Sequence, residues 1–199
     1  TSYQKEFTGL LGLVDDGTYL ATLHGVNRTT FPITQSTVIG SVTALSADVI
    51  QRAIDLADQR GDGDTSDLIM HHSVRRAYIA LTDADRRYAG GDLSSPDAGT
   101  VAAKKGRLTF GGIPIMEEKY APYGIIFGVD RSGFSRYVLV PGEWADEDGS
   151  VLSRIGTGTS AQDAFEAYYR IWDEFHNDYA ARCWRLDGVT ATVTVAHIE

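Results

Sequence analysis

Four short apolar runs, each bounded by turn residues, constrain the fold more than any other feature of this sequence. They read RLTF, IPIM, GIIFGV and RYVLV and lie within residues 107–140. Runs of this length that are rich in β-branched and aromatic side chains are typical of strands, and glycine or proline between them favours turns. We therefore predict that residues 107–140 contribute strands to one sheet, together with the apolar run DLIM at 67–70.

Two segments that precede these strands have the period of amphipathic helices. In the first, 46–60, Ser46 is a natural N-cap and Gly61 is placed to end the helix. In the second, 74–84, Ser73 is the expected N-cap. The expected core draws on both helices and on the strands: Ile50, Ile54, Leu68, Ile69, Tyr78, Leu81, Ile113, Ile125 and Phe127.

The run GTGTSA at 156–161 allows two interpretations. It follows the strand-like VLSRI and precedes QDAFEAYYRIWDEF, and Asp187 ends the next strand-like run, so a dinucleotide-binding unit is one of them. However, few residues remain after this run, whereas a doubly wound sheet needs several more βα units. We favour a glycine turn followed by a helix over 161–178 that Ser160 caps, and we expect no dinucleotide binding.

The bulk composition argues against several classes of protein. A net charge of −9 and a pI of about 4.9 disfavour a protein that binds nucleic acid by broad neutralisation of phosphates. Cys183 is the single cysteine, so the chain has no internal disulfide framework and no cysteine-rich zinc site. No apolar run approaches the ~20 residues that span a bilayer, and the first residues do not read as a signal peptide.

Candidate chemical groups are few, and each has a simpler structural interpretation. His71 and His72 are adjacent, and adjacent residues on a strand point to opposite faces, which disfavours a shared metal ion. Other titratable residues lack a metal-ligand spacing or a partner nucleophile: His24, His176, His197, the acid pairs Glu117-Glu118 and Asp83/Asp85, and the basic doublets Arg75-Arg76 and Arg86-Arg87. The doublets are typical of a solvated face or of pairing with neighbouring subunits, and phosphate contact is the less favoured alternative. We predict no catalytic, cofactor-binding or metal-binding residue.

Five aromatic residues and one isoleucine within the expected helix at 161–178 form a set wider than one helical stripe: Phe165, Tyr168, Tyr169, Ile171, Trp172 and Phe175. We expect some of them to pack in a core and some against another element or another chain. The sequence therefore contains many apolar patterns that are typical of buried surfaces, but no motif that is typical of a catalytic or ligand-binding site. This balance favours a structural or interaction protein over an enzyme.

The order of the motifs resembles that of tailed-bacteriophage major capsid proteins. DLIMHHSVRRAYIAL at 67–81, followed after a loop by GRLTFGGIPIMEEKYAP at 106–122, is similar to the middle of that family. The matching positions in the second run are Leu108, Phe110, Gly112, Ile113, Pro114 and Ile115, then Glu117 and Glu118. The upstream FTGLLGLVDDGTYLATLHGVNR and the ending NDYAARCWRLDGVTATV resemble the same family, so the resemblance covers most of the chain.

The resemblance implies the Hong-Kong-ninety-seven-like fold, an α+β fold with an axial domain of mixed sheet flanked by helices and part of a peripheral domain. We expect 1–43 to be an N-terminal connecting segment of the peripheral domain and 44–142 an axial-domain-like core. Residues 143–199 would supply a loop, a long helix and a C-terminal strand. The implied function is that of a structural subunit, with no enzymatic activity, which self-assembles into an icosahedral shell enclosing double-stranded DNA.

The implied partners are other copies of the chain, in hexamers and pentamers. Scaffolding or other virion proteins are further candidates, packaged DNA is contacted without sequence specificity, and no membrane is involved. The implied location is the virion capsid, assembled in the host cytoplasm. Some family members form a Lys–Asn crosslink beside a Glu, but no such trio can be placed here, so no catalytic residue is carried over.

Two alternatives stay open: an encapsulin-like compartment shell protein with the same fold, and a small nucleotide-binding enzyme that uses the loop from Gly156 to Ala161. The chain begins at Thr1 rather than Met. Family members are longer and carry an arm, a hairpin loop and a spine helix toward the N-terminus, and 1–43 has no pattern for these. We therefore expect a fragment that folds and stays soluble but does not close shells by itself.

Overall fold

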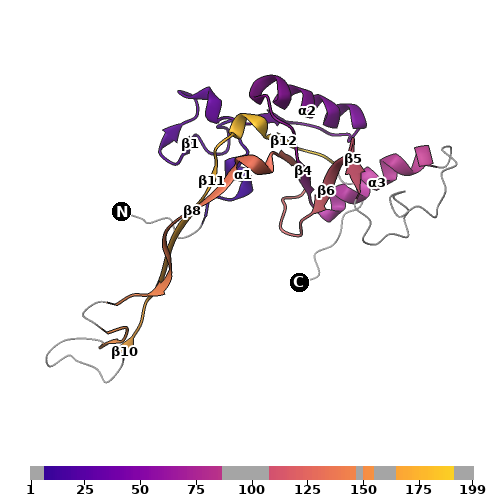
Figure 1. Ribbon diagram of the computed structural model, residues 1–199. Coiled ribbons are helices and arrows are strands. Elements are labelled where there is room, and N and C mark those ends of the chain that lie inside the picture. The colour runs from indigo at the N-terminus through magenta and orange to yellow at the C-terminus, as the bar shows by residue number, and fades with distance from the viewer. Residues whose placement is uncertain (1–6, 87–107, 147–149, 155–164, 191–199) are drawn as a thin grey trace. The chain divides into compact units, whose positions relative to one another are not determined.

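The computed structural model describes residues 7–86, 108–146, 150–154 and 165–190, which belong to two compact units. The larger unit contains Gly9–Phe134 and the residues from Asn177 on, and the smaller is built mainly from Ser135–His176. The larger unit holds a sheet and two long helices, and the smaller holds a two-stranded ribbon (Figure 1). None of the helices in the described ranges is long and apolar enough to cross a membrane.

A six-stranded mixed sheet forms the centre of the larger unit, in the order β3-β12-β7-β4-β6-β5. β4 pairs antiparallel with β7 and parallel with β6, β12 pairs antiparallel with β7 and parallel with β3, and β5 pairs antiparallel with β6. The strands are β3 (Thr37–Ile39), β4 (Asp67–Met70), β5 (Thr109–Phe110), β6 (Ile113–Glu117), β7 (Ile126–Val129) and β12 (Trp184–Leu186). The sheet therefore joins segments from most of the length of the chain.

The predicted sheet is confirmed for β4, β5, β6 and β7, but the prediction for the run RYVLV is wrong. That run lies in β8 (Phe134–Trp144), which pairs with β11 (Tyr169–Asn177) outside the six-stranded sheet. The place beside β7 is taken by β12, which comes from the far end of the chain. A local apolar pattern identifies a strand but does not choose its neighbour, because strand pairing is a tertiary property.

Helix α2 (Ala47–Gly61) forms where the periodicity predicts a helix over 46–60. The Ser46 hydroxyl accepts the Val49 N–H at 3.3 Å, so the predicted N-cap is confirmed. The helix runs through Gly61 and ends at Asp62, whose φ of 47° is left-handed. Gly61 serves close packing instead, because a Cβ there would lie 2.7 Å from the backbone of the 3₁₀ turn η4 (Ala180–Arg182).

Helix α3 (His72–Arg86) contains the predicted 74–84 but begins earlier. The predicted N-cap, Ser73, lies in the first turn, and His71 occupies the capping position. The His71 carbonyl accepts the N–H groups of Val74 and Arg75 at 3.0 Å each, and its ring Nδ1 accepts the Ser73 N–H at 3.2 Å. The prediction failed because serine is a far more common N-cap than histidine.

Apolar side chains pack on both faces of the sheet. The main cluster joins Ile50, Ala53 and Ala57 of α2 and Val74 and Tyr78 of α3 to the strand residues Leu68, Met70, Ile115, Ile126, Trp184 and Leu186. A smaller cluster holds Val14, Phe127, Val129 and Cys183, with the short helix α1 (Leu10–Leu13) beside it. Neighbours on a strand point to opposite faces, so Ile126 enters the first cluster and Phe127 the second.

The predicted core is confirmed apart from Leu81, which is 38% exposed. Tyr78 already reaches the last strand of the sheet, where its hydroxyl donates to the carbonyl of Thr109 in β5 at 3.1 Å. Leu81 lies one turn further along α3 and is not among the residues that pack against either cluster of the described chain. Ile54, Ile69, Ile113 and Ile125 are partly buried against the two clusters.

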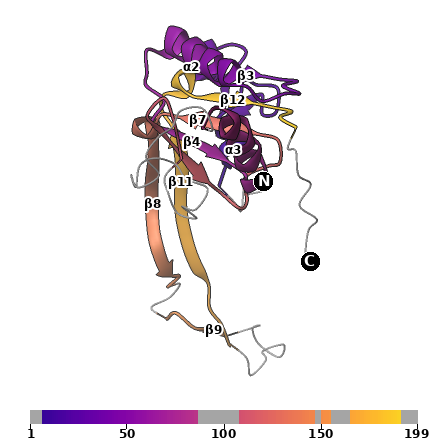
Figure 2. The same ribbon diagram turned by 90° about the vertical axis from the view of Figure 1, so that its right-hand side faces the viewer.

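The predicted helix over 161–178 is wrong. Residues 161–164 lie outside the described ranges, Phe165–Glu166 form β10, which pairs with β9 (Ser153–Arg154), and Tyr169–Asn177 form β11. β11 and β8 run side by side (Figure 2). They are antiparallel, because the Ala145 N–H just past the end of β8 donates to Tyr168 before the start of β11, whereas Tyr137 near the start of β8 contacts His176.

The residues of β11 explain this outcome. The run YYRIWDEFH is dominated by aromatic and β-branched side chains, which are weak helix formers and favour strands.

Near the N-terminus, β1 (Thr22–Leu23) and β2 (Val26–Asn27) form a small hairpin whose turn residues, His24 and Gly25, both have positive φ. The predicted C-terminal strand at 189–198 lies mostly outside the described residues.

Candidate assembly surface

The ribbon formed by β8 and β11 exposes large apolar side chains on both of its faces. Ring contact between Trp144 and Tyr169 marks one face, and contact between Tyr137 and His176 marks the other. Because side chains alternate along a strand, Val138 and Ile171 share the first face, and Leu139 and Trp172 share the second. The apolar side chains on these faces are 49% to 76% exposed: Tyr137, Val138, Leu139, Trp144, Tyr169, Ile171 and Trp172.

Polar cross-strand pairs fix the register of the ribbon. Arg170 donates to Glu143 Oε1 from Nε at 3.1 Å and from Nη2 at 2.8 Å. Arg136 donates from Nε to Asp173 at 2.6 Å and also forms an ion pair with it. The Tyr169 ring lies over Gly142, where a Cβ would fall 2.1 Å from the Tyr169 hydroxyl. Both arginines are thus paired across the ribbon, and the large apolar side chains remain exposed.

A ribbon of this kind requires further contacts to be stable. In the part of the chain that the structure describes, β8 and β11 form a sheet of only two strands. An isolated two-stranded sheet is at best marginally stable in water, and contiguous exposed apolar surface marks an interaction site. The ribbon is therefore the candidate assembly surface of this chain.

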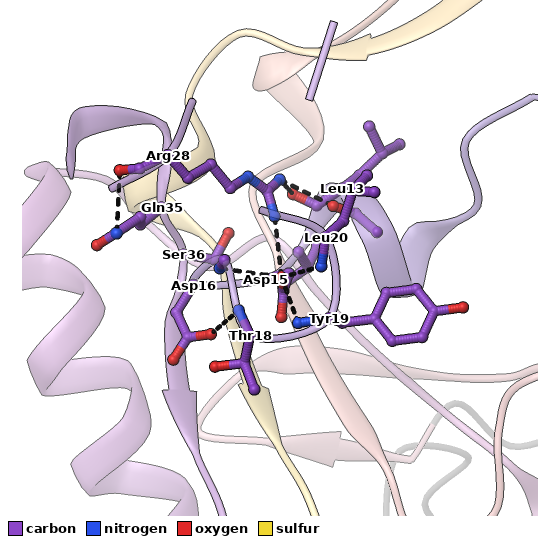
Figure 3. A network of polar contacts seen from close by, with 12 residues as sticks. Leu13, Asp15, Asp16, Thr18, Tyr19, Leu20, Arg28, Gln35 and Ser36 are labelled. Atoms are coloured by element: carbon purple, nitrogen blue, oxygen red, sulfur yellow. Dashed lines mark hydrogen bonds and ion pairs between the residues drawn. The ribbon is translucent and has the colours of Figure 1, made fainter. Parts of the chain in front are cut away.

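A buried polar network holds the N-terminal segment of the larger unit in place (Figure 3). The side chains of Asp15 and Arg28 are fully buried and form an ion pair at 3.2 Å. Asp15 Oδ2 also accepts the N–H groups of Gly17, Tyr19 and Leu20 at 2.9, 3.1 and 2.9 Å. One carboxylate thereby organises the whole turn from 15 to 20, which explains the fixed path of a segment with little regular structure.

Two arginines satisfy the free carbonyls at the end of α1. Arg28 Nη2 donates to Gly12 and Leu13 at 2.8 and 3.2 Å, and Arg185 Nη1 donates to Leu11 and Val14 at 3.1 and 3.0 Å. Arg185 comes from β12 and also lies 3.3 Å from the second oxygen of Asp15. Cations at the C-terminal end of a helix offset both its unpaired carbonyls and its dipole. The network therefore ties the N-terminal segment to the sheet.

Burial changes the protonation properties of this network. Burial lowers the pKa of the Arg28 guanidinium from its ordinary value, although the charge and hydrogen bond of Asp15 act in the opposite direction. At Asp16, burial raises the pKa, but hydrogen bonds from the side chain and N–H of Thr18 outweigh it and the pKa is lowered. An arginine stays charged at neutral pH in either case. The Asp15–Arg28 contact is thus a buried structural ion pair.

The histidine pair lies where a strand meets a helix. His71 and His72 are not on a strand, as the sequence interpretation assumed, but at the junction of β4 and α3, and their rings lie 3.6 Å apart. Among the described residues, no three His, Cys, Asp or Glu side chains gather closely enough to hold a metal ion. The structure places His24 in the β1–β2 turn and His176 on the ribbon, and His197 lies outside the described ranges.

The remaining candidates are separated in the fold. Glu117 pairs with Arg75 at 3.3 Å, and Glu118 Oε1 accepts the Tyr120 N–H at 3.1 Å. Asp187, the acid proposed for a nucleotide site, pairs with Arg185 at 2.8 Å. The GTGTSA loop, together with the side chains of Asp83, Asp85, Arg86 and Arg87, lies outside what the structure describes.

An apolar pocket of about 290 Å³ lies between α1 and the loop that follows β6. Its lining is Gly9, Leu10, Leu11, Ile69, Glu118, Tyr120, Ala121, Pro122 and Phe127. Among these lining residues, Glu118 is the single carboxylic acid, and there is no histidine, lysine, arginine or cysteine. The pocket therefore lacks the converging polar groups of a catalytic site.

Cys183 is expected to react about 100-fold more slowly with a thiol reagent in the native protein than in the urea-unfolded chain. Its side chain is fully buried, and burial raises the pKa of the thiol, so little reactive thiolate is present. Labelling kinetics with an aromatic disulfide reagent in the presence and absence of urea measure the ratio. Equal rates would mean that β12 is accessible in the native state.

Comparison with known proteins identifies the fold of this chain. The sequence matches no known family profile, and no curated protein sequence matches it. The structure is similar to the capsid asymmetric unit of cyanophage A-1(L), with 12% sequence identity and a TM-score of 0.55, over 85% of this chain and 55% of that chain. A second similar structure is the holo-SrpI encapsulin complex from Synechococcus elongatus PCC 7942, with 17% identity and a TM-score of 0.46, over 82% of this chain and 56% of that one. This chain spans just over half the length of these two chains. The chain has the α+β Hong-Kong-ninety-seven-like fold of phage major capsid proteins, as its sequence resemblance predicted.

Proposed function

We propose that this chain is part of a structural subunit that self-assembles into the icosahedral shell of a tailed phage. The observation that carries the proposal is the fold, which matches a phage capsid subunit over 85% of the chain. The role is structural rather than catalytic, and its site of action is the virion capsid. Hexamers and pentamers are the expected assemblies, because a shell closes by repeating heterologous contacts around rotation axes.

The ribbon supports this proposal by its physical character. A sheet with one apolar face needs one covering surface, whereas β8 and β11 present apolar side chains on both faces. A subunit in a closed shell has several neighbours, so surfaces on more than one side become buried. The intra-ribbon ion pairs, Glu143–Arg170 and Arg136–Asp173, keep the strands in register during assembly.

The charge of the chain is compatible with enclosing DNA without binding it tightly. A net charge of −9 opposes the phosphate contacts that dominate non-specific DNA binding. Packaged double-stranded DNA would therefore be held by the closed wall, without base-specific contacts. Scaffolding or other virion proteins are further expected partners, and assembly would take place in the host cytoplasm.

The contents of purified particles test the proposal. We expect particles made by the complete gene product during phage growth to protect double-stranded DNA from nuclease. Particles that instead hold a defined protein cargo and no protected DNA would favour the encapsulin-like alternative. Isothermal calorimetry with NAD and ATP tests the enzyme alternative, for which saturable micromolar binding that is lost in Gly158→Val is the supporting result.

In the complete gene product, Leu139→Asp is expected to lower the yield of closed particles at least about ten-fold. The substitution places a charge on the apolar ribbon, where burial of an unpaired carboxylate is costly. Leu139 is 76% exposed in the isolated chain, so the variant should keep the circular dichroism spectrum of the wild type. Negative-stain microscopy and light scattering measure the yield. The matched control is Gln59→Asp, which adds the same charge to the exposed surface of α2. Normal assembly of Leu139→Asp would show that the ribbon is not an assembly contact.

A further inference from the structure

A pocket of about 360 Å³ lies near the end of the six-stranded sheet at which the parallel neighbours β4 and β6 begin. Its lining combines polar and apolar side chains: Ser66, Asp67, Pro114, Ile115, Met116 and Arg131. All of these residues belong to the larger unit, and none of them is part of the β8–β11 ribbon. The pocket is therefore a second surface feature, additional to the candidate assembly surface.

Arg131 is fixed in this pocket at both of its ends. Its backbone N–H donates to the Ser66 hydroxyl at 2.8 Å, and its Nη2 lies 2.9 Å from each carboxylate oxygen of Asp67. The Asp67 side chain is only 7% exposed, whereas that of Arg131 is 71% exposed. A long surface side chain normally loses conformational entropy when it binds a partner. Because Arg131 is already held in place, this loss is smaller here.

Most of the Arg131 guanidinium remains available to a ligand. Its three nitrogens all carry N–H donors. In the part of the chain that the structure describes, only Nη2 has partners, which are Asp67 and, at 3.9 Å, the Met116 sulfur. The Asp67 carboxylate is occupied by this contact and by the Ser66 hydroxyl at 3.0 Å. The pocket thus presents the unpaired Nε and Nη1 donors to solvent.

The groups beside these donors indicate what the pocket binds. Met116 is 46% exposed, and Pro114 and Ile115 add further apolar surface. Charged N–H donors next to apolar atoms fit an anion that is carried on a short aliphatic stem. In a protein, that description is met by the side chain of an aspartate or a glutamate.

A second copy of the chain can supply this carboxylate. The sequence holds 27 acidic residues against 18 lysines and arginines. On α2, for example, Asp48, Asp55 and Asp58 are exposed, and none of the three forms an ion pair with another described residue. Two copies of net charge −9 repel each other, so contact is favoured where a fixed cation of one copy meets a carboxylate of the next. A phosphate of DNA fits less well, because a single arginine on so acidic a chain neutralises little of the backbone.

We propose that the Arg131 pocket is a contact between copies, in which Nε or Nη1 of Arg131 donates to an acidic side chain of a neighbouring subunit. This proposal rests on the proposed function, since it requires assembly of like subunits. The contact is heterologous, because the pocket of one copy meets a different surface of the next, as in a ring around a rotation axis. Every subunit repeats it, so a modest contribution per contact is multiplied over the shell.

Assembly of the complete gene product tests the proposal. The double variant Asp67→Asn with Arg131→Met removes both charges of the pair, so no buried charge is left unpaired and the fold should be kept. We expect its yield of closed particles, measured by light scattering and negative-stain microscopy, to fall at least about five-fold. Asp67→Asn alone keeps the Arg131 cation and should assemble like the wild type. Lys119→Met removes a cation from an exposed position outside the pocket and should also assemble normally.

These variants separate a contact between copies from a purely structural ion pair. Urea unfolding of the 199-residue chain should give the same stability for Asp67→Asn and for the double variant. Equal losses of assembly in these two would show that the pair only supports the fold, and normal assembly of the double variant would show that Arg131 makes no contact. Either result overturns the proposal.

Cryo-electron microscopy of wild-type particles decides the question if the double variant does not fold. A carboxylate of another copy must lie within hydrogen-bond distance of Nε or Nη1 of Arg131. Solvent, a nucleic-acid phosphate, a different virion protein or a carboxylate of the same subunit in that place would overturn the proposal. A wild-type product that forms no particles would refute the proposed function, and this inference with it, whereas particles without the contact refute this inference alone.

Discussion

Asp15→Asn is expected to destabilise the larger unit by about 3–5 kcal/mol, the range measured when one partner of a buried ion pair is removed. The asparagine has nearly the same shape and can still accept backbone N–H groups. However, it leaves the fully buried Arg28 guanidinium 3.2 Å from a neutral group, and it removes one of the two carboxylates near Arg185. Urea unfolding followed by the fluorescence of the buried Trp184 measures the free energy.

The neighbouring residue provides the control. Asp16 Oδ1 accepts the Thr18 N–H at 2.9 Å, but the side chain is only partly buried, so Asp16→Asn should cost about 1 kcal/mol or less. Because the folded pKa of Asp16 is lowered, its contribution is present above the unfolded value of about 3.9 and is lost as the pH falls through the folded pKa. The effect of Asp16→Asn should therefore disappear in acid. Equal effects of the two variants at pH 7 would contradict the structural role of Asp15.

Gly128→Ala is expected to cost about 3 kcal/mol or more, or to prevent folding of the larger unit. A Cβ at Gly128 would lie 2.0 Å from Cε2 and 2.3 Å from Nε1 of Trp184. The indole cannot easily move aside, because it is fully buried and its Nε1 donates to the Thr65 hydroxyl at 2.9 Å. Overpacking of a rigid core commonly costs 1–3 kcal/mol, and this overlap is severe. Thermal and urea unfolding give the measured loss.

A second substitution separates overlap from other effects of alanine. Trp184→Leu is itself destabilising, but it removes the ring that Cβ would strike, so the double variant should be clearly less destabilised than the sum of the two single variants. Gly40→Ala is the control, because nothing lies within 4 Å of a Cβ there, and its effect should stay within about 0.5 kcal/mol. Additive effects of Gly128→Ala and Trp184→Leu would refute the close contact.

The local sequence pattern predicts a helix or strand correctly where contacts with the rest of the fold do not change its secondary structure. α2 was predicted nearly to the residue, because Ser46 caps it and its apolar face covers the sheet. β11 was not, because YYRIWDEFH is apolar at helical as well as alternating spacing. Its partner strand β8, through contacts such as Glu143 with Arg170, decides between the two. The one feature of the sequence that indicates a strand here is that the apolar residues cover more than one helical stripe. On a helix, the same feature is interpreted as additional exposed apolar surface.

The polar network and the cap of α3 could not be predicted from the local sequence pattern, for a different reason. Asp15-Asp16-Gly17 indicates a turn, but nothing in the local pattern shows that Asp15 is buried against Arg28 and against Arg185 from the far end of the chain. Serine is the statistically favoured N-cap, but α3 begins at His72, so His71 rather than Ser73 occupies the capping position. The resemblance in motif order, which covers most of the chain, did predict the fold that these contacts stabilise.

Cryo-electron microscopy of the complete gene product that contains this chain tests the central claim most directly. We predict closed icosahedral particles in which both faces of the β8–β11 ribbon are buried, with Leu139 and Trp172 in contact with other segments of the shell. The six-stranded sheet should appear in every subunit with the strand order β3-β12-β7-β4-β6-β5. A protein that forms no closed particle under any assembly condition, or a particle in which the ribbon remains in solvent, would contradict the account.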